Sequence, residues 1–256
     1  MMERADARAL APGMLTAEKM LAWRRSLGTG YRAQPPEGVL LTHQGSLFRS
    51  LAAGFPPRRQ KGLYAELAIL PRTNGRVAVA GNFGIGGPAT AVVIEELAAI
   101  GVERIIAVDL AASLSPEVRS GTVFLTSDAI CADGTSPHYS AASGLIDVDP
   151  DLSARLAAAL ARREVPFTAG RVWSTDAVYR ETAAEVQRYA AQGALVADME
   201  TAALLACGRA LGVQAASALV VADTLFEEEW RPPPEPKRLQ ERLRRVAEAA
   251  RDALLE

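Results

Sequence analysis

Two acidic residues flank a methionine within residues 196–204, directly before an Ala/Leu-rich stretch. They are Asp198 and Glu200, with Met199 between them. An ionised carboxylate offers only hydrogen-bond acceptors, so both are candidates for binding a ligand that donates hydrogen bonds. Acids are also favoured in the first turn of a helix by the helix dipole. This segment alone therefore leaves a binding role and a structural role open.

A third acid, Asp223, follows the apolar run at residues 215–221, which predicts a buried strand. Open α/β sheets place their ligand sites at the carboxyl ends of strands. Two independent acidic positions are thus predicted to converge on one edge of a sheet. The alternative for Asp223 is a structural one, in which a strand-end Asp caps the following turn.

Clustered glycines at Gly84, Gly86 and Gly87 lie between an apolar run and a segment with helical spacing. Glycine allows positive φ values and lets the backbone approach a ligand closely. It also allows tight packing of a strand against a helix, and both uses fit this spacing. Because the order is not G-x-G-x-x-G, we exclude a nicotinamide dinucleotide site.

The elements that must position these residues alternate between apolar runs and amphipathic segments. Strands are predicted at residues 39–41, 77–80, 105–108, 121–126, 167–173 and 215–221, and helices at 16–27, 89–101, 150–163, 183–192, 201–211 and from 236 onward. This alternation predicts an α/β fold with a mixed, mostly parallel sheet flanked by helices. The length of 256 residues fits one domain over residues 1–256, with weak signals in residues 1–70.

Composition excludes several classes of function. The net charge of −2 gives no global positive field for nucleic acid. The two cysteines, Cys131 and Cys207, show no metal-binding or redox spacing, and we expect no metal and no cofactor. No run of eighteen apolar residues predicts a membrane span, and no secretory signal is evident, so a cytoplasmic protein is expected.

Four ordered segments between about residues 75 and 224 together resemble nucleoside phosphorylases of the hexamer-forming class, and uridine phosphorylases most closely. They are Gly84-Ile85-Gly86-Gly87-Pro88 followed by Glu95-Glu96-Leu97 and Gly101, then Asp133-Gly134-Thr135-Ser136-Pro137-His138-Tyr139, then Met199-Glu200, and finally Asp223. Four matches in order are far more specific than any single one.

The resemblance implies a nucleoside phosphorylase-like fold and cleavage of the N-glycosidic bond of a purine or pyrimidine nucleoside, with phosphate as co-substrate. It also implies a homo-oligomer built from dimers, up to a hexamer. Cleavage builds negative charge on the departing base, so a nearby acid lowers the barrier by donating a proton. The implied roles are ribose binding by Met199 and Glu200, base binding by Tyr179 and Asp198, proton donation by Asp223, and a substrate loop at Gly84, Gly86 and Gly87.

The sequence departs from this family where phosphate is held. The family uses a Gly-Asp-Pro-x-Arg loop, whereas the chain reads Thr42-His43-Gln44-Gly45-Ser46-Leu47-Phe48-Arg49 after the strand at 39–41. Arg49 remains a candidate only with a shift in register. The family's Arg-x-Gly-Thr/Ser becomes Ala107-Val108-Asp109-Leu110, and the carboxylate of Asp109 would repel phosphate.

Two further family positions also differ. The arginine that a neighbouring subunit contributes falls near Tyr64, with Arg58, Arg59 and Lys61 close in sequence. The Gln-x-Arg with which uridine phosphorylases read uracil is replaced by Arg180-Glu181-Thr182. Specificity for uridine therefore does not follow.

Three hypotheses stay open. The first, favoured by the resemblance, is a phosphorolytic enzyme in which Arg49, Arg58, Arg59 or Lys61 rebuild the anion site. The second is a hydrolytic nucleosidase in which water replaces phosphate and Glu200 or Asp109 orients it. The third is a nucleoside-binding protein without catalysis.

Overall fold

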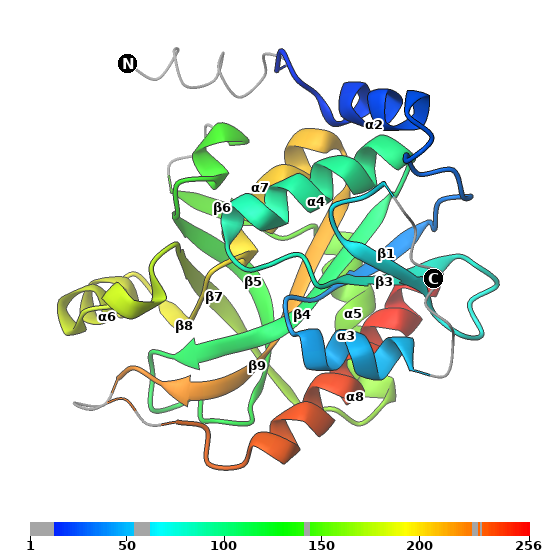
Figure 1. Ribbon diagram of the computed structural model, residues 1–256. Helices are drawn as coiled ribbons and strands as arrows, with labels where there is room; N and C mark the ends of the chain where they lie inside the picture. Colours follow the sequence, from blue (N-terminus) through cyan, green and yellow to red (C-terminus); the bar gives the residue numbers. More distant parts are fainter. Residues whose placement is uncertain (1–12, 54–61, 141–143, 227–229, 231) are drawn as a thin grey trace.

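The structure is a computed structural model that describes residues 13–53, 62–140, 144–226, 230 and 232–256 (Figure 1). Within these residues, the strands are β1 (Gly38–Leu41), β2 (Glu66–Ile69), β3 (Val77–Gly81), β4 (Arg104–Ser113), β5 (Val123–Ala132), β6 (Leu145–Asp147), β7 (Phe167–Thr175), β8 (Ala194–Asp198) and β9 (Gln214–Thr224). The helices are α2 (Ala17–Ser26), α3 (Gly45–Ala52), α4 (Gly87–Ile100), α5 (Pro150–Arg162), α6 (Ala183–Ala190), α7 (Thr201–Leu211) and α8 (Pro236–Leu255), with short 3-10 turns η1 (Ser136–His138) and η2 (Val178–Arg180).

The described strands form one mixed sheet in the order β2-β3-β1-β4-β8-β7-β5-β6, and β9 pairs with both β4 and β5. These pairings close β4, β8, β7, β5 and β9 into a ring. Five of the nine pairings, those of β1 with β3, β1 with β4, β4 with β9, β5 with β7 and β7 with β8, are parallel. The predicted mixed, mostly parallel α/β fold is confirmed.

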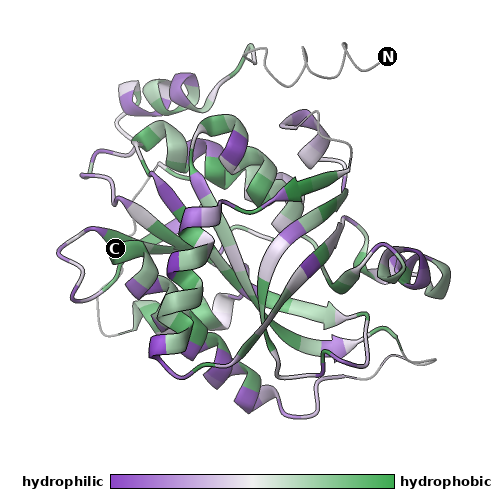
Figure 2. Cartoon of the chain, turned by 180° about the vertical axis from the view of Figure 1, so that it is seen from behind, coloured by the Kyte–Doolittle hydropathy of each residue, from purple (hydrophilic) through white to green (hydrophobic). Residues whose placement is uncertain are grey.

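Helices cover both faces of the sheet. Side chains of α4 and α7 share one core cluster with β1, β3 and β4, while those of α5 and α8 share a second with the opposite side of the same strands. Figure 2 shows hydrophobic strands through the centre and helices that carry both polar and apolar faces. Helix α8 shows why a helix packs on the sheet with one face. Its residues Leu239, Leu243, Val246 and Ala250 recur at spacings of three and four, so they lie on the same face, and all four are buried.

Helix ends follow capping rules that the sequence displays. Asp149 caps α5 by accepting a hydrogen bond from the Leu152 N–H. Gly101 and Gly212 end α4 and α7 in left-handed conformations, with φ of 101° and 70°. The helix predicted at 89–101 begins two residues earlier, because Pro88 can occupy the first turn, where its missing N–H needs no partner.

Several elements differ from the sequence prediction. The strands β4 and β5 run well beyond the apolar stretches at 105–108 and 121–126, since pairing with β8, β9, β6 and β7 accommodates polar residues within them. The short α3, β2 and β6 were not predicted. Arg58, Arg59 and Lys61, named above as candidates for the anion site, lie outside the described residues. In the part of the chain that is described, no helix combines the length and apolarity that a membrane span requires.

Candidate active site

A buried carboxylate–imidazole pair lies just beyond the end of β1. The strand stops at Leu41, which is opposite Ala107, whereas β4 continues and brings Asp109 beside the residues that follow β1. Asp109 Oδ2 lies 2.9 Å from His43 Nδ1, and the two side chains are only 5% and 2% exposed. Asp109 Oδ1 accepts hydrogen bonds from the His43 N–H at 2.7 Å and from Thr42 Oγ1 at 3.1 Å. Three donors therefore converge on one carboxylate.

The second ring nitrogen of His43 reaches helix α4. His43 Nε2 lies 2.8 Å from Thr90 Oγ1, and this hydroxyl also lies 3.0 Å from the Gly86 carbonyl oxygen, which can only accept. We assign the hydroxyl proton of Thr90 to the Gly86 carbonyl, which also accepts the Thr90 N–H at 3.1 Å, so His43 Nε2 donates to Thr90 Oγ1. With Nδ1 donating to Asp109, both ring nitrogens carry protons, so we assign His43 as an imidazolium.

The environment of His43 agrees with this protonation. Burial acts to lower its pKa, but the charge and hydrogen bond of Asp109, with smaller contributions from Glu200 and Asp198, outweigh burial and raise the pKa to about 9. The ring of Phe83 packs edge-on against the imidazole at 4.8 Å between centroids. The pair is thus charged and internally neutralised at neutral pH.

Glu200 is connected to the same region through the glycine turn. It occupies the N-cap position of α7, and its Oε1 accepts the Gly86 N–H at 2.7 Å while Oε2 lies 3.3 Å from the Met199 N–H. Burial raises the pKa of Glu200 to about 7; Asp198 and Asp109 act in the same direction, whereas His43 and the Gly86 N–H oppose them.

The glycines of the turn are needed for two different structural reasons, backbone conformation and lack of space for a side chain. Gly84 and Gly86 have φ of 101° and 87°, which other residues adopt with strain. Gly87 is limited by space, because a Cβ there would lie 3.0 Å from Thr135 Oγ1 and 3.3 Å from Ala203 Cβ. The turn therefore packs against the 133–139 segment, and Met199 Cε lies within about 4.0 Å of a Cβ built at Gly86. Of the predicted site residues, Gly86, Met199 and Glu200 lie together.

Asp198 is buried at the carboxyl end of β8 and holds the surrounding backbone. It accepts hydrogen bonds from Ser174 Oγ at 2.6 Å, and from the N–H and hydroxyl of Thr201. Burial raises its pKa. Since these bonds tie β7, β8 and α7 together, Asp198 has a structural role here, and its contact with a base remains a prediction.

The third predicted acid lies in a more open region. Asp223 is partly buried near the end of β9, and its Oδ2 accepts a hydrogen bond from Trp230 Nε1 at 2.6 Å. Glu181, which the sequence analysis did not identify as a site residue, interacts electrostatically with Asp223, Glu185 and Asp198; burial and these charges raise its pKa to about 7. The Tyr179 side chain is 96% exposed, so nothing described in this chain packs over the predicted base-stacking residue.

Arg49 does not join the buried pair. Arg49 is exposed on α3. Its guanidinium lies beside Gly45, because a Cβ built at Gly45 would lie 3.2 Å from Arg49 Nη1; the same Cβ would lie 3.2 Å from Asn82 Oδ1. Among the residues that the structure describes, no arginine or lysine makes a hydrogen bond or ion pair with Asp109, Glu200 or Asp223. The cation closest to these acids in the described network is His43.

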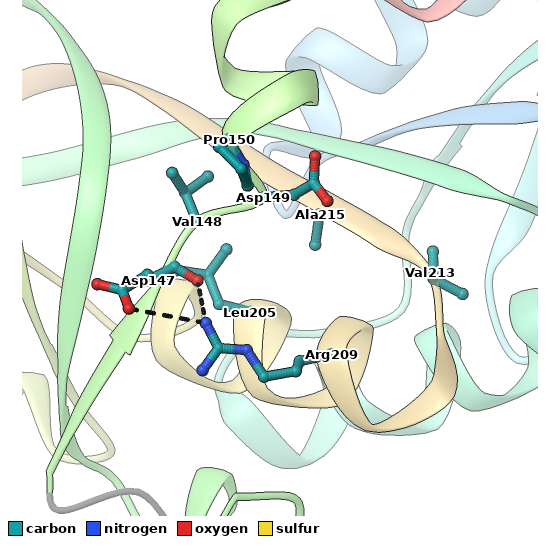
Figure 3. Close-up of a pocket in the computed structure, with 8 residues that line it drawn as sticks. All are labelled: Asp147, Val148, Asp149, Pro150, Leu205, Arg209, Val213 and Ala215. Atoms are coloured by element: carbon teal, nitrogen blue, oxygen red, sulfur yellow. Dashed lines mark hydrogen bonds and ion pairs between the residues drawn. The ribbon is translucent and has the colours of Figure 1, made fainter.

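A separate cavity of about 150 Å³ lies at the other end of the sheet. Asp147, Asp149, Arg209 and Ala215 are among its lining residues, and Figure 3 shows Arg209 pointing toward Asp147 across its mouth. Arg209 donates to the Asp147 carbonyl oxygen at 3.0 Å. Ala215 is the second residue of β9 and Asp223 is near its end, so at about 3.3 Å per residue the cavity lies roughly 25 Å from the predicted acid. It is not part of the candidate active site.

Comparison with known proteins identifies the family of the chain. A sequence profile described as "Phosphorylase superfamily" matches residues 50–256. The chain is 28% identical over 149 residues to the uridine phosphorylase of Treponema pallidum, covering 54% of this chain and 58% of that protein. It is also 28% identical over 138 residues to the guanosine phosphorylase of Halorubrum lacusprofundi, covering 54% and 57%. The matched regions thus span a little over half the length of these relatives.

A solved structure extends the likeness to the whole fold. The crystal structure of AMP nucleosidase from Bacteroides thetaiotaomicron matches with a TM-score of 0.72 and 20% identity, covering 92% of this chain and 98% of that one. At this identity the match concerns the fold alone. Because the sequence profile covers most of the chain, the protein belongs to the phosphorylase superfamily.

Proposed function

We propose that this protein cleaves the N-glycosidic bond of a purine or pyrimidine nucleoside and that water is the nucleophile. The observation that carries this proposal is the Asp109 carboxylate, which lies within β4 just beyond the end of β1 and takes three hydrogen bonds there. In the family that the sequence resembles, the corresponding segments hold phosphate. Here the donors that could bind an anion are directed to a carboxylate of the chain itself.

Electrostatics favour water over phosphate at this position. Two like unit charges 4 Å apart repel by about 4 kcal/mol at an effective dielectric constant of about 20. Because His43 neutralises Asp109, a phosphate at this position would meet no net positive charge, and an ionised Glu200 would repel it. His43 cannot offset this repulsion because it is already paired with Asp109. A neutral water molecule meets no such barrier.

The remaining residues are suited to the same reaction. In this proposal Glu200 accepts hydrogen bonds from ribose hydroxyls, and Met199 beside the glycine turn packs under the sugar, as the family resemblance implies. The water oxygen bonds to the anomeric carbon as the bond from that carbon to the base nitrogen breaks. Asp223 donates a proton to the departing base, and Asp109 or Glu200 takes the proton that the water loses.

The test is a panel of purine and pyrimidine nucleosides, incubated with and without phosphate, in which free base, ribose and ribose 1-phosphate are measured. We expect free base and ribose at a rate independent of phosphate. Product formed only with phosphate would support phosphorolysis instead, with the anion held by Arg49, Arg58, Arg59 or Lys61. No product from any nucleoside would favour the non-catalytic binding protein.

The assembly state belongs to the same proposal. The resemblance implies a homo-oligomer built from dimers, up to a hexamer. Light scattering coupled to size-exclusion chromatography tests it, and a mass close to the monomer's 27.1 kDa would contradict it.

A further inference from the structure

A chain of hydrogen bonds connects the His43–Asp109 pair to Glu200. His43 Nε2 donates to Thr90 Oγ1 at 2.8 Å, and Thr90 donates to the Gly86 carbonyl oxygen at 3.0 Å. The N–H of the same residue donates to Glu200 Oε1 at 2.7 Å. The Gly86 carbonyl oxygen also accepts the backbone N–H of Thr90 at 3.1 Å, so this glycine is held on its carbonyl side by the hydroxyl and the N–H of Thr90 and on its N–H side by Glu200.

This arrangement matters because Gly86 is flexible by nature. Its φ of 87° lies where glycine alone is unstrained, and glycine has more accessible conformations than any other residue. Thr90 is fully buried and His43 has almost no exposed side chain, so both hold their positions without competition from water. The bonds from Thr90 hold the carbonyl of the 86–87 peptide group, and the Gly86 N–H, which belongs to the preceding peptide group, is placed relative to that carbonyl by the φ and ψ of Gly86.

We propose that His43 and Thr90 are positioning residues that fix the Glu200 carboxylate for binding ribose hydroxyls, acting through the Gly86 turn and through the charge of His43. This inference rests on the proposed function for the role of Glu200. It adds that residues with no contact to the sugar determine how well the sugar is held, and it gives the pair a second role besides filling the anion position.

The charge of His43 acts on the same carboxylate. Burial raises the pKa of Glu200, as do Asp198 and Asp109, whereas His43 and the Gly86 N–H lower it. Loss of the imidazolium should therefore raise the pKa of Glu200 further and leave more of it protonated at neutral pH. A protonated carboxyl loses acceptor capacity toward hydroxyl donors.

The decisive variants are Thr90→Val and His43→Gln, with Thr90→Ser as the rescue. Valine keeps the shape of threonine but removes the hydroxyl, whereas serine keeps the hydroxyl. Thr126→Val is a matched control, because Thr126 is equally buried and its hydroxyl has no hydrogen-bond partner among the described residues.

The first readout compares a ribonucleoside with its 2′,3′-dideoxy analogue, which lacks the hydroxyls that Glu200 would hold. Thr90→Val should lower kcat/KM for the ribonucleoside about tenfold and lower it much less for the analogue, as expected for one weakened charge-assisted hydrogen bond. Thr90→Ser and Thr126→Val should leave the ratio of the two substrates near its wild-type value. Equal losses on both substrates would overturn the inference, because a merely structural defect acts on both.

The second readout needs no turnover. The pKa of Glu200, followed by NMR of the carboxyl carbon in labelled protein, should rise in His43→Gln and in Thr90→Val and stay unchanged in Thr126→Val. An unchanged pKa in both variants would overturn the inference. If the wild type cleaves no nucleoside, the proposed function fails while this titration still decides whether His43 and Thr90 control Glu200.

Discussion

The two ends of the candidate site differ in how completely their polar groups are partnered. At the end formed by β1, β4 and the glycine turn, the side chains of His43, Asp109, Thr90 and Glu200 are buried; the first three are hydrogen-bonded in series, and Glu200 is linked to them through Gly86. At the β9 end, Asp223 is partly buried and accepts one bond from Trp230, a residue that is 61% exposed. The end that we propose for the sugar and the nucleophile is thus preorganised within this chain, and the end that we propose for the base is open.

This difference indicates which end of the candidate site can determine the choice of nucleophile and which can determine the choice of base. In the proposed reaction, a rigid, buried network would hold the groups around the anomeric carbon in one arrangement, which favours a fixed choice of nucleophile. An open end with Tyr179 96% exposed does not define a base-binding surface from the described residues alone. The choice of base would then depend on what covers this end, including a second copy of the chain in the proposed oligomer.

The largest expected effect comes from the open end. Asp223→Asn should lower kcat by about 10²- to 10⁴-fold, because a positioned general acid contributes that much, while nucleoside affinity stays within a few-fold. Steady-state kinetics combined with calorimetric binding measure the two quantities separately. Glu185→Gln is the control, since Gln keeps the capping bond of α6 and removes a nearby charge. An Asp223→Asn variant with wild-type kcat would remove Asp223 from the mechanism.

The closed end should respond mainly in stability. Asp109→Ala leaves the buried His43 without its partner, and breaking a buried ion pair in this way costs about 3–5 kcal/mol of unfolding free energy. Urea unfolding at pH 7 measures it. Glu248→Gln, which breaks an ion pair with Arg163 in which the acid is 40% exposed, should cost less than about 1 kcal/mol. Equal costs for the two variants would contradict the contrast between a buried network and an open surface.

The same pair predicts how stability depends on pH. The pKa of His43 is raised from 6.5 to about 9 on folding, so its contribution is complete below pH 6.5 and is lost as pH rises through 9. Between pH 7 and pH 9 the loss should be about 2 kcal/mol. Unfolding free energies of the wild type and His43→Gln across this range test it. A wild-type slope that persists in His43→Gln would assign the titration to another group.

The smallest effect is expected at Arg49. Because this side chain is exposed and does not contact the buried pair, Arg49→Gln should change kcat/KM by less than about twofold at any phosphate concentration. Turnover measured over a phosphate series tests this. A large loss that appears only with phosphate would restore Arg49 as part of an anion site and favour phosphorolysis.

Sequence patterns point to some residues of the candidate site and miss others. Met199, Glu200, Gly86 and Asp223 could be named because each follows or precedes an apolar run with clear spacing. The pairing of His43 with Asp109 could not, since it depends on β1 stopping opposite Ala107 while β4 continues. That relation between strands far apart in sequence is invisible to local patterns.

Other features of the structure that the sequence did not predict have similar physical reasons. The strand β5 continues through Thr126 and Asp128 with a register shift, so its polar residues gave no strand signal. Glu181 lies in the link between η2 and α6, and only its approach to Asp223 marks it as a site candidate. The glycine turn was read correctly as a strand-to-helix connection, although its hydrogen bond to Glu200 required the folded chain.

The most direct test of the central claim is a single-turnover reaction of enzyme with ribonucleoside in H₂¹⁸O that also contains phosphate, with the sugar product analysed by mass spectrometry. If Asp109 and His43 fill the anion position, the product is free ribose that carries ¹⁸O from the attacking water, after correction for exchange at the anomeric carbon. Ribose 1-phosphate as the main product would contradict the account, because phosphate would then have reached a position that the carboxylate is argued to exclude.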